Sequence, residues 1–428
     1  MFKVRDSVVD KVQSPVKIVD AIMGSGKSTA MFKLMREGYS KEDRRYLYIS
    51  IFNDEVGDGD KGTEGRGHEE LPEMDFHMPK TVYTKGKIGG LKPLLKKGCN
   101  VSTTHATFKN FDMETIQLMI DGKYTLIIDE AVDCINQYED LVQEDLNILI
   151  DSGTIVLDDI DRLVWVGNKV SKESVHHKVM RLCETESLYH YKDNIIMWEY
   201  PPLLLKQLDD VYIVTYLFEG SIMASWMNKN KIEYKFVPEC VLGLKKEEDI
   251  KVTIREKLEI LKSNNLNKLR GTKVGRENQF SVAWYKRKVL DEECLQGIVK
   301  IMESTVSRTK TKSGKVFWTT FKKYKNALTG KGYKKPPKDS LEAYLPYTQK
   351  AINDYRDHTL CMYAVDVHKT PLEINYLAER GVTFARDIYS LSEMLQFIFR
   401  GSIRKGEHMQ ILVLSERMEG LLRGWLDE

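Results

Sequence analysis

The residues with the clearest chemical meaning are 21–28, which read Ala-Ile-Met-Gly-Ser-Gly-Lys-Ser. Two glycines allow a tight turn whose backbone N–H groups point at an anion, because glycine has no Cβ to clash. Lys27 and Ser28 follow the turn immediately. A lysine at this position reaches the terminal phosphates of a nucleotide, and the hydroxyl that follows it binds Mg²⁺. The segment therefore predicts a binding loop for ATP and Mg²⁺.

This loop needs a strand before it and a helix after it. Residues 16–19 form an apolar run typical of a short strand, and residues 29–35 have the pattern of a helix. The start of such a helix adds a favourable field for phosphate. The residues expected to bind the nucleotide are Met23, Gly24, Ser25, Gly26, Lys27, Ser28 and Thr29.

A pair of adjacent acids supplies the second part of the expected site. The buried-looking strand 124–128 ends in Asp129 and Glu130. Ligands of open α/β sheets bind beside the carboxyl ends of the strands, so both acids should lie near the glycine-rich loop. We expect Asp129 to hold Mg²⁺ together with Ser28, and Glu130 to deprotonate the attacking water.

The order of strands and helices along the chain predicts an α/β protein with two parallel sheets. Strand patterns alternate with helices through the N-terminal half, interrupted by a β-hairpin pattern at 187–199. A new series starts with 232–237 and continues with strand patterns near residues 316, 360 and 410. We therefore expect an N-terminal domain of residues 1–226 and a C-terminal domain of residues 227–428.

Composition narrows the class of protein. The 428 residues carry a net charge of +2, and no apolar run has the length needed to cross a bilayer. The first residues lack an apolar signal core, which favours the cytoplasm and argues against a membrane partner. The six cysteines are widely spaced, so neither a disulfide framework nor a metal cluster is expected.

Charge is unevenly distributed. Residues 261–340 contain 20 Lys and Arg against 6 Asp and Glu, although the whole chain is close to neutral. Aromatic residues interrupt this basic segment and could stack on bases. A solvated surface is the simpler alternative, but the combination favours contact with nucleic acid. Lys286, Arg287 and Lys288 are the leading candidates for that contact.

Hydrolysis requires more positive charge than one lysine and one Mg²⁺ supply, and an arginine from another domain is the common source. Arg400 and Arg404 are four residues apart and follow Gln396 at the same interval. On a helix these three side chains would share one face. We therefore predict that Gln396 contacts the nucleotide and that Arg400 or Arg404 is catalytic, with Arg400 favoured for contact with the terminal phosphate.

The order of these segments resembles that of superfamily 2 helicases, and more narrowly the DEAD/DEAH-like helicases of tailed bacteriophages. The similarity rests on residues 21–28, 102–105, 129–132, 215–220 and 396–404, and extends to 317–322 and 353–357.

This resemblance implies two RecA-like domains of the P-loop NTPase class, with ATP bound in the cleft between them. It implies a motor that couples ATP hydrolysis to translocation or unwinding. DNA, single-stranded or branched, is the expected partner, with RNA as the alternative and phage replication or recombination proteins as further partners. The residues that it places on the nucleic-acid side are Thr103, Thr104, His105, Trp318, Thr319 and Lys322.

Three other functions share part of this pattern. A phage terminase-type packaging ATPase has the same loop and acids but adds a nuclease with several metal-binding carboxylates, and no such triad is evident here. A non-unwinding, nucleotide-dependent regulatory or anti-defence protein would bind nucleic acid without motor activity. A small-molecule kinase would need neither the second sheet nor the basic segment.

Overall fold

The computed structural model describes residues 14–427 except for 52, 83–85, 172, 193–194, 271–277, 289–291, 335–340 and 350–353. The chain forms two compact units. The first contains Met1–Asp20, Lys27–Gly243 and Pro371–Phe384, and the second contains Ala21–Gly26, Leu244–Thr370 and Ala385–Glu428. The boundary expected at residues 226 and 227 stays a prediction.

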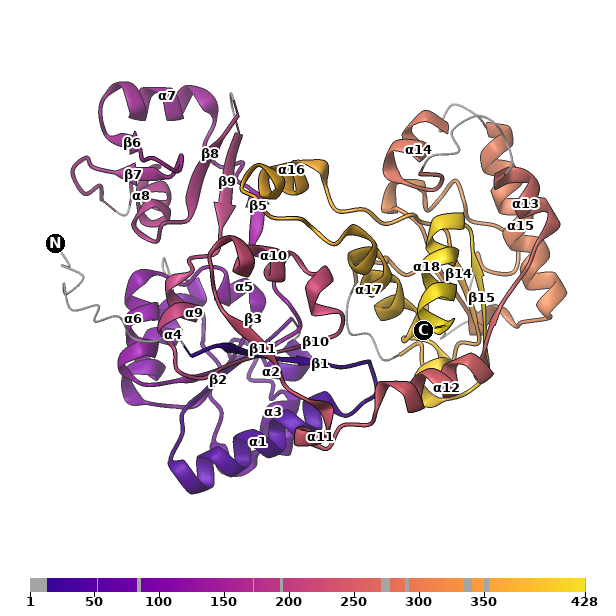
Figure 1. Cartoon of the computed structure of the whole chain (residues 1–428), viewed down its shortest axis with the longest axis horizontal. Coiled ribbons are helices and arrows are strands. Elements are labelled where there is room, and N and C mark those ends of the chain that lie inside the picture. Colours follow the sequence, from indigo (N-terminus) through magenta and orange to yellow (C-terminus); the bar gives the residue numbers. More distant parts are fainter. Residues whose placement is uncertain are drawn as a thin grey trace. The chain divides into compact units, whose positions relative to one another are not determined.

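The first unit is built on a six-stranded parallel sheet (Figure 1). Its strands, in spatial order, are β11 (Tyr234–Phe236), β1 (Val16–Asp20), β10 (Val211–Thr215), β4 (Thr125–Asp129), β2 (Tyr46–Ser50) and β3 (Val101–Thr104). Strands β2 and β10 are buried at every position, as expected for strands covered on both faces. Strand β11 corrects one expectation, because it pairs with β1 instead of opening a second sheet.

Short helices connect these strands. They are α1 (Lys27–Glu42), α2 (Asn53–Val56), α3 (Arg66–Glu70), α4 (Gly86–Lys97), α5 (His105–Phe108), α6 (Met113–Asp121), α9 (Leu203–Gln207), α10 (Ile222–Lys229) and α11 (Glu239–Leu242), with 3-10 turns η1 (Pro72–Met74) and η2 (Phe218–Gly220). Three of them begin with a side-chain cap that satisfies a free backbone N–H. Thr104 caps α5, Asp112 caps α6 and Ser221 caps α10.

A smaller region is inserted after β4. It contains the antiparallel sheet β5 (Ile135–Gln137), β9 (Ile195–Glu199) and β8 (Leu188–Tyr191), the hairpin β6 (Ile155–Leu157) and β7 (Leu163–Trp165), and helices α7 (Gln143–Asp151) and α8 (His177–Glu184). The expected hairpin at 187–199 is confirmed, because β8 and β9 pair antiparallel. Leu146, Leu163 and Leu188 are fully buried in the core of this region.

One helix of the first unit comes from the C-terminal half of the chain. Helix α16 (Pro371–Glu379) packs against β5 and α10, and Figure 1 shows it beside this small sheet. Tyr376 of α16 donates a hydrogen bond to Glu199, whose side chain is only 1% exposed. Lys229 of α10 forms an ion pair with the same carboxylate at 2.8 Å. Two strong donors thus compensate the buried charge of Glu199.

The second unit contains a four-stranded parallel sheet. Its strands, in spatial order, are β12 (Leu258–Ile260), β15 (Met409–Val413), β14 (Leu360–Tyr363) and β13 (Val316–Thr319). The helices are α12 (Glu247–Lys257), α13 (Asn264–Arg270), α14 (Val282–Lys288), α15 (Glu292–Thr309), α17 (Arg386–Ile398) and α18 (Glu416–Asp427), with turns η3 (Ser313–Lys315), η4 (Lys322–Tyr324) and η5 (Ser402–Lys405). The expected α/β class with two parallel sheets is confirmed.

Two expectations from composition concern the chain as a whole. No helix among the described residues is long and apolar enough to cross a bilayer. The cysteines are free thiols, and the described residues contain no group of three or more Cys, His, Asp or Glu arranged to hold a metal ion.

Candidate functional site

The glycine-rich loop has the backbone that an anion-binding turn requires. Gly24 and Gly26 have φ values of +84° and +98°, which strongly favour glycine. A Cβ built on either residue would meet no heavy atom within 4 Å, so open space lies beside both. Ser25 between them is 3% exposed, and its hydroxyl has no hydrogen-bond partner in the described structure. The loop therefore combines a constrained turn, adjacent space and an unused polar group.

Helix α1 begins at Lys27, directly after this turn. Its first turn contains no acidic residue that would repel an anion. The positive end of the dipole of this 16-residue helix lies at Lys27 and Ser28. The side chains of both residues are partly exposed. This end of the helix is suited to binding a phosphate group.

The two acids lie at the carboxyl end of β4. The Tyr48 hydroxyl donates a hydrogen bond to Asp129 Oδ2 at 2.9 Å. Glu130 has a left-handed backbone with φ of +69°, and its N–H donates to the carbonyl oxygen of Val214 at 2.8 Å. The Thr215 hydroxyl donates to Glu130 Oε2 at 3.1 Å. Both carboxylates are thus oriented by side chains of the neighbouring strands β2 and β10.

The pKa of Asp129 is raised because the side chain is buried and lies near another carboxylate. Burial raises its pKa to about 7, with a further contribution from the charge of Glu130. The hydrogen bond from Tyr48 and the positive charge of Lys27 act in the opposite direction. The influence of Lys27 connects the start of α1 with the end of β4. A divalent cation at Asp129 would favour its ionised form.

Strand β10 lies between β1 and β4 in the sheet. The turn after β10 is held by Asp20, at the end of β1, whose carboxylate accepts the N–H groups of Leu217 and Phe218 at 2.6 and 3.0 Å. Leu217 needs this support because its φ is +57°. Asp20 therefore anchors the segment that follows Thr215.

The residues expected to contact nucleic acid in the first unit have structural roles as well. Thr103 is 3% exposed within β3. Thr104 accepts the N–H of Thr107 as the cap of α5. The Nε2 atom of His105 lies 2.9 Å from the carbonyl oxygen of Asp129, which joins this segment to the acid pair. Thr104 and His105 remain partly exposed.

The arginine segment differs from the expected helix. Helix α17 ends at Ile398, so Arg400 and Arg404 do not extend the helical face that carries Gln396. Gln396 is partly exposed in the last turn of α17, whereas Arg404 lies exposed in the short turn η5. The shared helical face is therefore wrong, because Phe399 caps the helix before Arg400 is reached.

Arg400 is a core residue of the second unit and is only 3% exposed. Its guanidinium group lies 5.0 Å from the ring centroid of Phe397 and donates to the carbonyl oxygens of Pro346 and Tyr347 at 3.4 Å. Burial lowers its pKa to about 10, partly opposed by the charge of Glu393. These contacts assign Arg400 a structural role in this conformation.

The basic segment divides into surface cations and core aromatics. Lys286, Arg287 and Lys322 are exposed, while the side chain of Lys288 lies outside the described residues. Trp318 and Thr319 belong to β13 and are 1% and 0% exposed. Their burial corrects the expectation that these two side chains lie on a nucleic-acid surface. Most other aromatics of the segment also pack in the core.

The sequence does not indicate the roles of three residues around the acid pair, which are Tyr48, Asp20 and Thr215. Tyr48 has the appearance of an ordinary strand residue, and Asp20 of a strand end. Thr215 was part of a recognised segment, but its bond to Glu130 depends on which strands are neighbours. Only the sheet order β1-β10-β4-β2 reveals these contacts.

Comparison with known proteins identifies relatives of prophage origin. The family model of the YonV middle domain matches residues 135–198, and that of the YonV C-terminal Rossmann-like domain matches residues 252–426. The SPbeta prophage-derived uncharacterized protein YonV of Bacillus subtilis (strain 168) is 29% identical, covering 96% of this chain and 98% of its own length. The chain is therefore similar to YonV over nearly its whole length.

The two regions matched by the family models correspond to separate structural regions of the chain. The YonV middle domain corresponds to the inserted region from β5 to β9. The YonV Rossmann-like domain covers the second parallel sheet and its helices, together with α16 of the first unit. Among solved structures, the DUF1998 helicase MrfA bound to DNA and AMPPNP matches with a TM-score of 0.36 and 9% identity. The match covers 97% of this chain, which spans about half (48%) of that helicase.

Proposed function

We propose that this protein is an ATP-dependent nucleic-acid motor, a DNA helicase or translocase of prophage type. The observation that carries the proposal is geometric: the glycine-rich turn follows β1 and the acid pair lies at the end of β4, and both strands belong to the same parallel sheet. Lys27 begins α1 after an open glycine-rich turn. Its positive charge acts on Asp129, the last residue of β4. A phosphate site beside a carboxylate pair suits nucleotide hydrolysis.

Each residue has a defined role in this proposal. The N–H groups of the loop and the Lys27 ammonium bind the phosphates of ATP, which leaves the terminal phosphate facing Glu130. Glu130 accepts the proton of the attacking water, and Thr215 and Tyr48 keep the two carboxylates in position. The left-handed backbone of Glu130 directs its side chain differently from a continuing strand.

The residues present fit a magnesium ion. Ser28 and Asp129 supply a hydroxyl and a carboxylate oxygen, the type of ligand that Mg²⁺ prefers. The raised pKa of Asp129 reflects burial and the nearby Glu130, a situation that a cation relieves. The described residues hold no cage of three or more ligating side chains, which agrees with an ion that shares its ligands with phosphate and water. When bound, Mg²⁺ would neutralise phosphate charge.

The second unit contributes an arginine and the basic segment in this proposal. Arg404 is the better candidate for contact with the terminal phosphate, because it is exposed, whereas Arg400 is committed to the core. The exposed cations Lys286, Arg287 and Lys322 would contact the backbone of the nucleic acid. Gln396 keeps its expected contact with the nucleotide as part of the proposal.

The test is ATP turnover with Mg²⁺, measured without nucleic acid and with single-stranded, double-stranded and branched DNA and with RNA. We expect stimulation by DNA and loss of turnover in Lys27→Ala. The matched control is Lys33→Ala, which removes an exposed lysine from the same helix. Wild-type turnover in Lys27→Ala would refute the ATP site. Nucleic-acid binding without turnover would instead support a regulatory protein, and metal-dependent DNA cleavage would support a terminase.

A further inference from the structure

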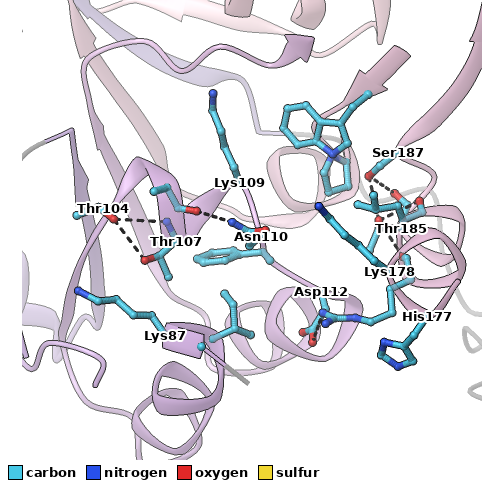
Figure 2. A pocket seen from close by; sticks show the side chains of 18 of the residues that line it. Lys87, Thr104, Thr107, Lys109, Asn110, Asp112, His177, Lys178, Thr185 and Ser187 are labelled. Carbon is cyan, nitrogen blue, oxygen red and sulfur yellow. Dashed lines mark hydrogen bonds and ion pairs between the residues drawn. The ribbon is translucent and has the colours of Figure 1, made fainter. Parts of the chain in front are cut away.

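A separate pocket of about 700 Å³ lies in the first unit, where the main sheet meets the inserted region (Figure 2). One side is formed by the end of β3 and by α5, including Thr104 and Lys109. Another side is formed by α8, by the residues that follow it and by β9, including Lys178 and Trp198. Its volume is within the range of ligand-binding sites. None of the residues assigned to ATP lines it.

The lining of this pocket is strongly basic. Among the described residues it carries the cations Lys87, Lys109, Lys178 and Arg181 against a single carboxylate, Asp112. In Figure 2, Lys87, Lys109 and Lys178 lie at separate places around the space and come from different parts of the chain. The cations are therefore distributed around the pocket rather than gathered at one point.

Three of these cations can rearrange toward a ligand, whereas Lys87 is paired with Asp58 at 3.0 Å. Lys109 is partly exposed and forms no ion pair within the described part of the chain. Lys178 pairs with Asp140, but both side chains are more than half exposed, and such pairs add little stability. Arg181 contacts Asp112 at 2.7 Å and keeps other guanidinium N–H groups for a second partner.

Asp112 does not cancel this positive charge. Its carboxylate already accepts hydrogen bonds from Lys92 at 2.6 Å and from the N–H of Thr115 at 2.9 Å, besides the contact with Arg181. The nearest acid is therefore occupied within the protein. An incoming anion would meet the cations and not an unpaired carboxylate.

Polar and aromatic groups complete the lining. Thr104 offers a hydroxyl, and Asn110 uses its amide nitrogen on Ala106, which leaves its amide oxygen available. Trp198 is half-buried and gives the pocket an aromatic wall. Base stacking on such a ring stabilises binding without sequence preference. A nucleic acid with unpaired bases offers phosphates to the cations, sugar hydroxyls to the polar groups and a base to the aromatic ring.

We propose that this pocket binds a segment of single-stranded nucleic acid, with its backbone phosphates on Lys109, Lys178 and Arg181 and an unstacked base against Trp198. Distributed cations match phosphates spaced along a strand, whereas a free nucleotide would require converging donors. A duplex keeps its bases stacked and cannot offer one to Trp198. The inserted region would thus act as a second wall that holds the strand against α5.

This inference rests on the proposed function, which supplies nucleic acid as the class of ligand. It deepens that function by naming a single strand as the substrate. The test is fluorescence anisotropy of the full-length, nucleotide-free protein with a labelled oligothymidylate at several salt concentrations. The test variant is Lys109→Glu with Lys178→Glu. The control is Lys97→Glu with Lys123→Glu, which makes the same charge change at exposed lysines of the same unit outside the pocket.

We expect the pocket variant to lose affinity by about tenfold or more and the slope of log affinity against log salt to fall by about 0.7 per contact removed. The control variant should keep most of its affinity. Trp198→Ala should also weaken binding, by about tenfold, and Trp198→Phe should restore most of it because the ring is retained. Thermal melting verifies that each variant is folded.

Equal affinity of the pocket variant and the control variant, whether both high or both reduced, would overturn the pocket as the binding site. The results distinguish failure of the pocket proposal from failure of the motor proposal. Lost oligonucleotide binding in the pocket variant of a protein without ATPase activity would support the pocket and refute the motor. DNA-stimulated turnover with unchanged binding in the pocket variant would support the motor and refute the pocket.

Discussion

The hydroxyl of Thr215 lies 3.1 Å from Glu130 Oε2 and donates a hydrogen bond to it across two adjacent parallel strands. The register of β10 and β4 places Val214 beside Asp129, so Thr215, the last residue of β10, lies beside Glu130, the first residue after β4. Thr215 is 3% exposed and its rotamers are restricted by packing. The acid proposed to activate water is therefore held by a rigid donor.

Thr215→Val should lower ATP turnover without altering the fold, because valine has nearly the same shape but no hydroxyl. A hydrogen bond to a charged group contributes about 1.5–3 kcal/mol, which predicts a loss of kcat of about ten- to a hundredfold. KM for ATP should change little. Thr215→Ser keeps the donor and serves as the control. Normal kcat in the valine variant would contradict a positioning role.

Lys27→Ala and Glu130→Gln should separate binding from chemistry. Lys27→Ala removes charge from the phosphates and should weaken both nucleotide binding and hydrolysis. Glu130→Gln keeps the size of the side chain but cannot accept the proton of water, so it should bind ATP and hydrolyse it very slowly. Equilibrium binding of a fluorescent ATP analogue and phosphate release measure the two properties. Identical behaviour of both variants would argue against the assigned roles.

Arg400 and Arg404 should respond differently to alanine. Arg404→Ala should reduce turnover far more than ATP affinity, as expected for a group that acts on the transition state. Arg400→Ala should instead lower the melting temperature, because it removes buried contacts with Phe397 and the Pro346 carbonyl. Turnover and thermal melting are measured on both variants. A stable Arg400→Ala protein with no turnover would reverse the two roles.

Acid should destabilise the second unit through His358. This side chain is 6% exposed, and burial, aided by the charge of Lys315, lowers its pKa below the ordinary 6.5. The unfolded chain therefore binds a proton more readily than the folded one, so the free energy of unfolding decreases as pH falls below about 6.5. His358→Asn should flatten this part of the pH profile, measured by urea unfolding at a series of pH values. An unchanged profile would exclude His358 as the cause.

Tyr376→Phe should destabilise the first unit, although Tyr376 lies near the C-terminal end of the sequence. The change removes a hydroxyl that hydrogen-bonds the buried carboxylate of Glu199. We expect a loss of about 1.5–3 kcal/mol in the free energy of unfolding. Tyr234→Phe, at a partly exposed tyrosine of β11, provides a matched control. Equal stability of both variants would show that Lys229 alone compensates Glu199.

Local patterns were sufficient to predict the α/β class, the glycine-rich turn before α1 and the acids after β4, because each depends on neighbours in sequence. The partners of those acids were not predictable, since Tyr48 and Thr215 reach them only through the order of the strands. Aromatic residues among basic ones were ambiguous for another reason. Trp318 could have stacked on a base or filled the core, and its burial at 1% exposure in the core cluster of the second unit decides for the core.

The placement of α16 affects how the chain can be made and divided. Residues 371–384 belong to the first unit, although they follow three strands of the second. During synthesis on the ribosome, the first unit therefore lacks its last helix until most of the second unit has been synthesised. A fragment ending at Gly243 would leave Glu199 without the hydroxyl of Tyr376. Cutting this protein into its two units by a single break in the chain would leave the first one incomplete.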